Sequence, residues 1–187
     1  MSLPARPNFG EPMDPIPEYW KDKPGCDPTV KSGVAQFRDF ILQNVGGGSL
    51  GIVRPCDVGG ASHHHEGRAW DWAMDANDPS DAAAVDRTLR WLKDTRIGWP
   101  ARRAGLQYII WDGKIWGWDD PYSKPREYTG ASPHRDHVHF SFTRPGAQGE
   151  TSFYRWLDAG APSSRASMGN AWPLAAIAVA ILARRRK

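Results

Sequence analysis

The six histidines of this 187-residue chain lie in two short clusters and nowhere else. The clusters are His63-His64-His65 and His134-Arg135-Asp136-His137-Val138-His139. Imidazole is the commonest metal ligand in proteins and the side chain whose charge changes near neutral pH. Two clusters so far apart in the sequence suggest that the fold brings them together, and a metal ion is the simplest reason for it to do so.

The first cluster belongs to a motif, S-x-H-x-x-G-x-A-x-D, that runs from Ser62 to Asp71. We expect His64 to lie on a loop that enters a strand over residues 68–74. Alternation along that strand places Ala69 and Asp71 on the same face, and the small side chain of Ala69 leaves room there for a bound metal. His64 and Asp71 are therefore candidate ligands.

The second cluster contains two histidines with the spacing of a strand. His137 and His139 are two residues apart within a predicted strand over 137–142, so both imidazoles point to the same face. His64, Asp71 and His139 would then form a tetrahedral site with an open fourth position for water, which is typical of catalytic rather than structural zinc sites. The sequence therefore predicts a Zn²⁺ site.

The elements that must position these residues follow from apolar periodicity and turn signals. Helices are predicted over 28–44, 80–95, 100–104 and 152–157, and Ser80 is the expected cap of the second. Strands are predicted over 50–53, 68–74, 107–111, 114–118 and 137–142, with an Asp112-Gly113 turn that makes a hairpin of the third and fourth. The pattern predicts an α+β fold, a small antiparallel β-sheet with flanking helices and the zinc site on the sheet.

Cys26 and Cys56 are the only cysteines, and neither lies in a CxxC pair that could share a metal. A disulfide between them would close a loop of roughly 30 residues and stabilise the fold by about 3 kcal/mol if chain entropy dominates. It would also favour an oxidising compartment. The alternative is a pair of unrelated buried thiols.

Composition divides the chain into three parts. Residues 1–24 are rich in proline and lack periodicity, which predicts an extended arm, and residues 25–160 hold the motifs and form the domain. Residues 161–187 are a linker and an apolar tail with a basic end. As a helix, the apolar segment 166–183 would reach about 27 Å, which suggests membrane contact; the alternative is an apolar helix packed on the domain.

The distribution of charge argues against nucleic-acid binding. The formal net charge is +3, but Arg184, Arg185, Arg186 and Lys187 at the end of the tail account for all of it. The rest of the chain is slightly acidic, and no basic stripe interleaved with aromatic residues appears in it.

Together the two motifs resemble those of the LAS metallopeptidases, a group that contains lysostaphin-type endopeptidases, D-alanyl-D-alanine peptidases and the hedgehog signalling domain. In that group the H-x6-D pair and the last histidine of H-x-H hold zinc, which implies this role for His64, Asp71 and His139. The stretch 26–154 is also similar to a bacterial and phage branch of predicted peptidoglycan peptidases, through the segments GRAWDW (67–72), YIIW (108–111) and HRDHVHFS (134–141).

The resemblance also implies roles for residues beside the metal. The run H-x-x-H-x-H resembles that of the murein endopeptidases of the group, in which its first two histidines flank the metal. The expected general base is His137, which alternation places on the metal face, or Asp136, which stands where many D-alanyl-D-alanine peptidases carry a glutamate. Arg54 matches the arginine that stabilises the oxyanion in the group, although the helix usual after that arginine is missing; His134 is the other candidate.

The function implied is that of a zinc-dependent peptidase, either a carboxypeptidase or an endopeptidase, which hydrolyses amide bonds in the peptide stems or cross-links of peptidoglycan. We expect a monomer in the cell envelope or secreted, although the first residues lack the pattern of a secretory signal. The apolar tail with its basic end, 166–187, is expected to be a membrane anchor or sorting signal. Two alternatives are a non-catalytic zinc-containing module that binds the cell wall, and a metal-independent wall-binding domain that uses some of the ten tryptophans.

Overall fold

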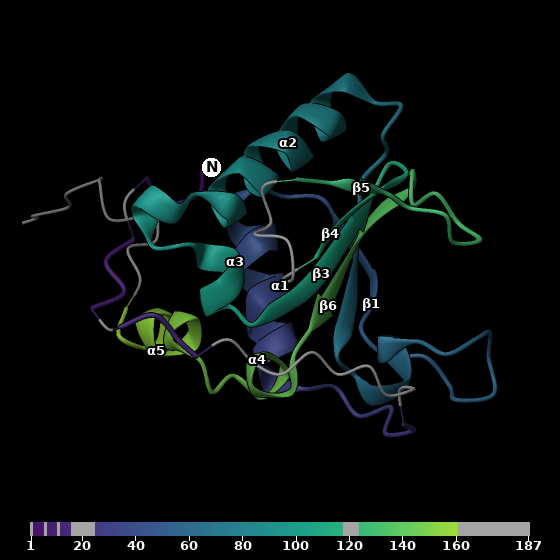
Figure 1. Ribbon diagram of the computed structural model, residues 1–187, viewed down its shortest axis with the longest axis horizontal. Helices are drawn as coiled ribbons and strands as arrows, with labels where there is room; N and C mark the ends of the chain where they lie inside the picture. Colours follow the sequence, from purple (N-terminus) through teal and green to yellow (C-terminus); the bar gives the residue numbers. More distant parts are fainter. Residues whose placement is uncertain (1, 6, 11, 16–24, 118–123, 161–187) are drawn as a thin grey trace, which may run out of the picture.

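A six-stranded antiparallel sheet forms the centre of the molecule in a computed structural model that describes residues 2–5, 7–10, 12–15, 25–117 and 124–160 (Figure 1). The strand order is β1-β2-β6-β3-β4-β5. The strands are β1 (Gly48–Gly51), β2 (Ala69–Ala73), β3 (Leu106–Trp111), β4 (Lys114–Gly117), β5 (Arg126–Glu127) and β6 (His137–Phe142). Together with the helices around it, this sheet confirms the expected α+β fold.

The helices are α1 (Ser32–Asn44), α2 (Pro79–Lys93), α3 (Pro100–Arg103), α4 (Arg144–Gln148) and α5 (Ser152–Asp158), with two 3-10 turns, η1 (His63–Glu66) and η2 (Thr95–Ile97). Three predicted details are wrong, and one of them is the first strand, which covers Gly48–Gly51 rather than 50–53. The first helix begins at Ser32 rather than near residue 28: the N–H of Asp27 donates a hydrogen bond to the carbonyl of His65, and Lys31, which precedes the helix, is extended. The cap of α2 is Asp78, not Ser80, since the Asp78 carboxylate accepts hydrogen bonds from the first turn.

The apolar core lies between α1 and one face of the central strands. Trp70 and Trp72 of β2 point to this face and are fully buried. Trp70 stacks on Phe140 of β6 with 5.5 Å between ring centroids, and Phe37 of α1 meets Phe140 edge-on at 5.3 Å. Since successive side chains of a strand alternate between faces, this packing turns Asp71 to the opposite face.

The described residues of the N-terminal arm contain no helix or strand, but they pack on the helical end of the domain. The ring of Phe9 lies 5.1 Å from that of Trp156 in α5, and the guanidinium of Arg103 lies over it at 4.7 Å. The Asp14 carboxylate accepts a hydrogen bond from the N–H of Ser152, the first residue of α5. The described part of the arm is therefore attached to the domain far from the histidine clusters.

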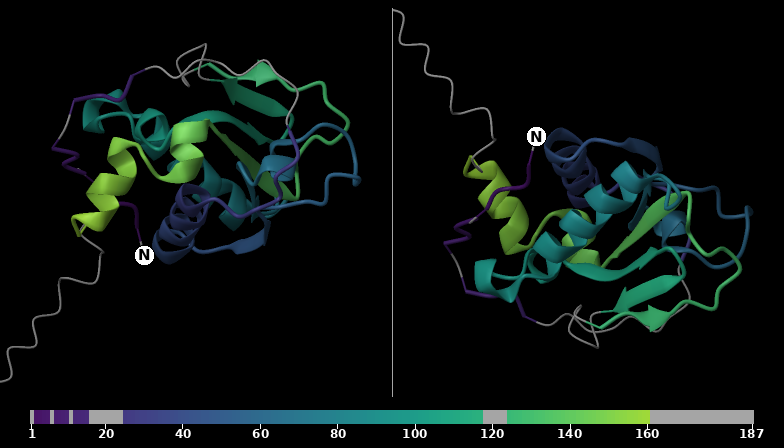
Figure 2. Two further views of the ribbon diagram at one scale, coloured as in Figure 1. Left: turned by 90° about the horizontal axis from the view of Figure 1, so that it is seen from below. Right: turned by 90° about the horizontal axis from the view of Figure 1, so that it is seen from above.

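The histidine-bearing segments gather at the other end of the molecule. In both views of Figure 2 the loop that carries η1 and the loop between β5 and β6 lie at the end of the sheet opposite to α5. Cys26 and Cys56 form the expected disulfide, with 5.8 Å between their Cα atoms, and it joins the segment before α1 to the loop after β1.

The expected apolar tail, 166–187, lies outside the described residues. Among the helices that the structure does describe, none combines the length and the apolar character needed to cross a membrane.

Candidate metal centre

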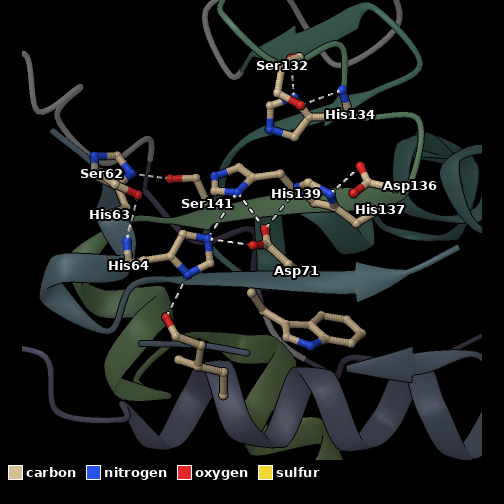
Figure 3. Close-up of polar contacts among 12 residues, drawn as sticks. Ser62, His63, His64, Asp71, Ser132, His134, Asp136, His137, His139 and Ser141 are labelled. Carbon is tan, nitrogen blue, oxygen red and sulfur yellow. Dashed lines mark hydrogen bonds and ion pairs between the residues drawn. The ribbon is translucent and has the colours of Figure 1, made fainter. Parts of the chain in front are cut away.

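His64, Asp71 and His139 meet at one point on the polar face of the sheet, as the sequence predicts (Figure 3). The Nε2 atom of His64 lies 3.1 Å from Oδ2 of Asp71 and 3.3 Å from Nδ1 of His139. Nδ1 of His139 is 2.9 Å from Oδ1 of Asp71. All three side chains are buried, and two imidazole nitrogens and a carboxylate oxygen so placed could hold a metal ion.

Strand pairing places two of the three candidate ligands. Asp71 of β2 lies directly opposite His139 of β6 in the antiparallel register, and side chains of residues paired in this way lie side by side on one face. The contact between them therefore follows from the register of β2 and β6.

The third candidate ligand is placed by a tight turn, η1, where the sequence suggests a loop. The Ser62 side chain accepts a hydrogen bond from the N–H of His64, and Gly67 ends the turn with a φ of 61°. A Cβ atom at position 67 would lie 1.9 Å from the carbonyl oxygen of Thr29. Ser62 and Gly67 of the motif thus stabilise the backbone conformation of η1, and this conformation positions His64.

A hydrogen bond fixes which nitrogen of His64 faces the other ligands. Its Nδ1 lies 2.8 Å from the carbonyl oxygen of Ile52. A carbonyl oxygen can only accept, so Nδ1 carries the proton and donates it. This leaves the lone pair of Nε2 directed at Asp71, and such a second contact is usual for a histidine that binds a metal.

The electrostatic environment favours the forms that bind metal. Burial lowers the pKa of His139 to about 4, against the opposing effect of its hydrogen bond to Asp71. Burial acts to raise the pKa of Asp71, but its close contacts with the imidazoles of His139 and His64 outweigh burial and hold that pKa well below its ordinary value. At neutral pH the centre therefore contains an ionised carboxylate and a neutral His139, as metal binding requires.

His137 and Asp136 form a pair beside the three ligands. Nε2 of His137 lies 3.6 Å from Oδ1 of Asp71, so its imidazole points toward the centre. Its Nδ1 lies 2.9 Å from the carboxylate of Asp136. Asp136 precedes β6, and 79% of its side chain is exposed. The carboxylate of Asp136 thus faces solvent and contacts one side of the His137 imidazole, and the other side of that ring faces the candidate ligands.

His134 lies over the same site in an unusual conformation. Its φ of 53° is in the left-handed region, and its ring centroid is 4.7 Å from that of His137. Nδ1 donates a hydrogen bond to the carbonyl of Ser132 at 2.7 Å, and burial lowers the pKa of the ring. The N–H of Asp112, in the hairpin turn, donates to the carbonyl of His134 and supports this conformation.

The three candidate ligands line a cleft of about 350 Å³ together with His134 and His137. Arg54 lies at its wall, as do two tyrosines that sequence reasoning did not single out. Tyr108 of β3 stacks on His139 at 5.7 Å, and Tyr128 meets His134 edge-on at 5.1 Å. Tyr108 could have been found from alternation along β3, but Tyr128 lies in a loop and no local signal marks it.

The two histidines on either side of His64 point elsewhere, as expected. His63 contacts the hydroxyl of Ser141 through Nδ1, and burial lowers its pKa to about 3. Nε2 of His65 lies 3.0 Å from the carbonyl oxygen of Val58, in the loop after β1. Each flanking ring therefore ties η1 to a different neighbouring segment.

The fold and the site define an α+β protein with a buried cluster of two histidines and one carboxylate in a cleft. Residues 26–139 match the family model described as VldE, C-terminal domain, and the chain belongs to that family. The match contains His64 and Asp71 and ends at His139, so it includes all three candidate ligands. No curated protein and no solved structure matches the chain.

Proposed function

We propose that this protein is a zinc-dependent peptidase of the LAS type that hydrolyses amide bonds in the peptide stems or cross-links of peptidoglycan. The observation that carries the proposal is the convergence of His64, Asp71 and His139, with spacing that matches the motifs of that group, at the base of a cleft. The choice of peptidoglycan as substrate rests on the resemblance of the motifs, because a site defines a chemistry more closely than a substrate.

The donor set supports zinc as the metal. Zinc in proteins is held by imidazole nitrogen and carboxylate oxygen at about 2.0–2.1 Å, and the ligand atoms of such a tetrahedral site lie about 3.3–3.4 Å apart. The separations among the ligand atoms of His64, Asp71 and His139 are 2.9, 3.1 and 3.3 Å. Small adjustments of the side chains would therefore fit the ion.

Zinc, when bound, would supply a Lewis acid that polarises the scissile carbonyl and makes water a better nucleophile. The chain itself must supply a base. We assign this role to His137, because its Nδ1 donates to the Asp136 carboxylate and the Nε2 lone pair is left facing the cleft. A general base needs this position within reach of the proton that it takes.

We propose that Asp136 orients the base, and the contact between the two side chains favours His137 over Asp136 as the general base. Its carboxylate lies on the solvent side of the imidazole. Such a contact fixes the tautomer of a catalytic histidine and stabilises the imidazolium that forms when the proton is taken.

Arg54 is the better candidate for stabilising the oxyanion. Its guanidinium is charged at every physiological pH, and the residue lines the cleft. Nδ1 of His134 is already committed to the carbonyl of Ser132. We therefore propose that Arg54 holds the developing charge and that Nε2 of His134 contacts another part of the substrate.

The remaining expectations follow from this function. The Cys26–Cys56 disulfide supports work in an oxidising compartment, which suits a protein of the cell envelope or a secreted one. Peptidoglycan peptides as partners, a monomeric state and membrane contact through 166–187 stay predictions.

Mass spectrometry of muropeptides after incubation of purified sacculi with the protein and zinc tests the proposal. We expect shortened stems or opened cross-links, with the newly released amine identifying the bond. Asp71→Ala and His139→Ala should abolish both cleavage and retention of zinc. Asp75→Ala changes an exposed carboxylate just beyond β2 and should leave both intact.

Two results would contradict the proposal. Cleavage by Asp71→Ala protein that has been stripped of zinc would show that the metal mechanism is wrong. A wild-type protein that binds sacculi and retains stoichiometric zinc, but releases no amines, would instead be the non-catalytic wall-binding module.

A further inference from the structure

We propose that His65 is a positioning residue that holds Arg54 in place at the cleft, acting through the backbone of the loop 55–60. The inference rests on the proposed function, because it assigns Arg54 a role in that reaction. The sequence motif gives His65 no role, since it flanks the ligand His64 and points away from the metal centre.

The side chain of His65 contacts the loop after β1. Its ring is buried, and Nε2 lies 3.0 Å from the carbonyl oxygen of Val58. Because a carbonyl oxygen only accepts, Nε2 must carry the proton and donate it. The backbone carbonyl of the same residue accepts from the N–H of Asp27 at 2.7 Å. His65 therefore joins the loop after β1 to the segment before α1.

Val58 is connected to Arg54 through a turn. The N–H of Val58 donates to the carbonyl of Pro55 at 3.1 Å and closes a turn. The next residue, Gly59, has a φ of 73°, and a Cβ atom at its position would lie 3.7 Å from Nη1 of Arg54. The guanidinium of Arg54 thus lies beside Gly59, and Gly59 directly follows Val58, whose carbonyl accepts the hydrogen bond from His65.

Side-chain packing does little to fix the loop 55–60. Asp57, Val58, Gly59 and Gly60 are all exposed. The attachments are instead the disulfide at Cys56, the hydrogen bond from His65 to Val58, and the hydrogen bond from the N–H of Arg54 to the carbonyl of His64 at 3.2 Å. Removal of the His65 donor would let the turn, and with it the guanidinium, move away from the cleft.

Two substitutions of His65 separate this role from a purely structural one. His65→Leu fills part of the same space but has no donor, and His65→Gln keeps an N–H at about the position of Nε2. With muropeptides as substrate, we expect His65→Leu to lower kcat/KM by about 10-fold, the scale of effect typical of residues that orient a functional group. His65→Gln should recover most of this loss, and neither change should alter the affinity for zinc.

A double-mutant cycle shows whether the effect passes through Arg54. If it does, His65→Leu should cost little further activity, less than about 2-fold, in a protein that already carries Arg54→Ala. Losses that multiply in the double variant, or a fall in zinc affinity in His65→Leu, would overturn the proposal.

Hydrogen–deuterium exchange of the loop 55–60 gives a result that does not depend on activity. We expect faster exchange there in His65→Leu than in wild type, and near-wild-type exchange in His65→Gln. Unchanged exchange in His65→Leu would refute the inference even if the wild-type protein is an active peptidase. If the wild-type protein has no peptidase activity but His65→Leu still exchanges faster, His65 does anchor the loop. The proposed peptidase, and the role of Arg54 in it, would then be refuted.

Discussion

The two faces of β2 and β6 have opposite chemistry, although they are made by alternate residues of the same two strands. One face carries Trp70, Trp72 and Phe140, which pack on α1. The other carries Asp71 and His139, which contact each other and His64. The side chains of the first face are held together by the burial of apolar surface and by close packing. Those of the second face are held together by the pairing of hydrogen-bond donors with acceptors.

This difference predicts what each face contributes. Burial of large apolar side chains is favourable in itself, so the aromatic face stabilises the fold whether or not a ligand is bound. Burial of an ionised carboxylate is costly unless the carboxylate is paired, so the polar face depends on its partners and gains from a cation. Substitutions on one face should therefore change the stability of the fold, and those on the other should change metal binding.

The largest effect should come from Asp71→Ala on the polar face. Zinc binds protein sites with apparent free energies of about 10–16 kcal/mol, so loss of one ligand should cost about 4 kcal/mol, roughly a 1,000-fold fall in zinc affinity. Isothermal titration with zinc would measure it. Asp136→Ala removes an exposed carboxylate outside the three ligands and should bind zinc nearly as wild type does. Equal affinities for Asp71→Ala and wild type would mean that Asp71 is not a ligand.

Trp70→Ala should have the complementary effect on the aromatic face. Truncation of a buried aromatic side chain costs about 3–5 kcal/mol, measured by urea denaturation in the presence of a chelator. The folded protein should still bind one zinc ion with an affinity within about 3-fold of wild type, because the candidate ligands lie on the other side of the sheet. Leu50→Ala, at a side chain that is 59% exposed, is the control and should change stability by less than about 0.5 kcal/mol.

The comparison also shows why one part of the fold was predictable. The alternation of Trp70, Asp71 and Trp72 marks two faces within a single short stretch of sequence, and the spacing of His137 and His139 does the same for β6. The Asp112-Gly113 turn is equally local, since both residues have positive φ, which this pair of residue types tolerates. The candidate ligands could be chosen from the sequence because each is marked by its immediate neighbours.

The missed features depend on contacts between distant segments. Helix α4 contains a proline and a glycine and has no clear helical pattern, and it forms where backbones approach closely: a Cβ atom at Gly33 of α1 would lie 2.2 Å from the carbonyl oxygen of Gly146. Tyr128 reaches the cleft only because its loop is held by the hairpin turn, where its N–H donates to the carbonyl of Gly113. No local pattern encodes either arrangement.

Removal of the disulfide should have an intermediate effect on stability. We expect it to be smaller than that of Trp70→Ala and larger than that of losing a single polar contact. Replacement of both Cys26 and Cys56 by serine should lower the free energy of unfolding by about 3 kcal/mol, measured by urea denaturation under non-reducing conditions. A thiol reductant should destabilise the wild type by a similar amount and have no effect on the double variant. A double variant as stable as wild type would show that the loop after β1 is held by its hydrogen bonds alone.

The smallest effect concerns a polar contact beside the candidate ligands, on the same face of the sheet. The hydroxyl of Ser141, on the same face of β6 as His139, meets Nδ1 of the buried His63. Ser141→Ala would leave that nitrogen without its partner and should cost about 1–3 kcal/mol of stability.

Replacement of both partners should cost less than replacement of one, because an unpaired buried polar group is penalised more than an absent one. We therefore expect Ser141→Ala combined with His63→Phe to be more stable than Ser141→Ala alone in chelator-treated urea denaturation. If the two substitutions were simply additive, the contact would contribute nothing specific. The polar face would then be held together by the three candidate ligands rather than by a wider set of paired groups.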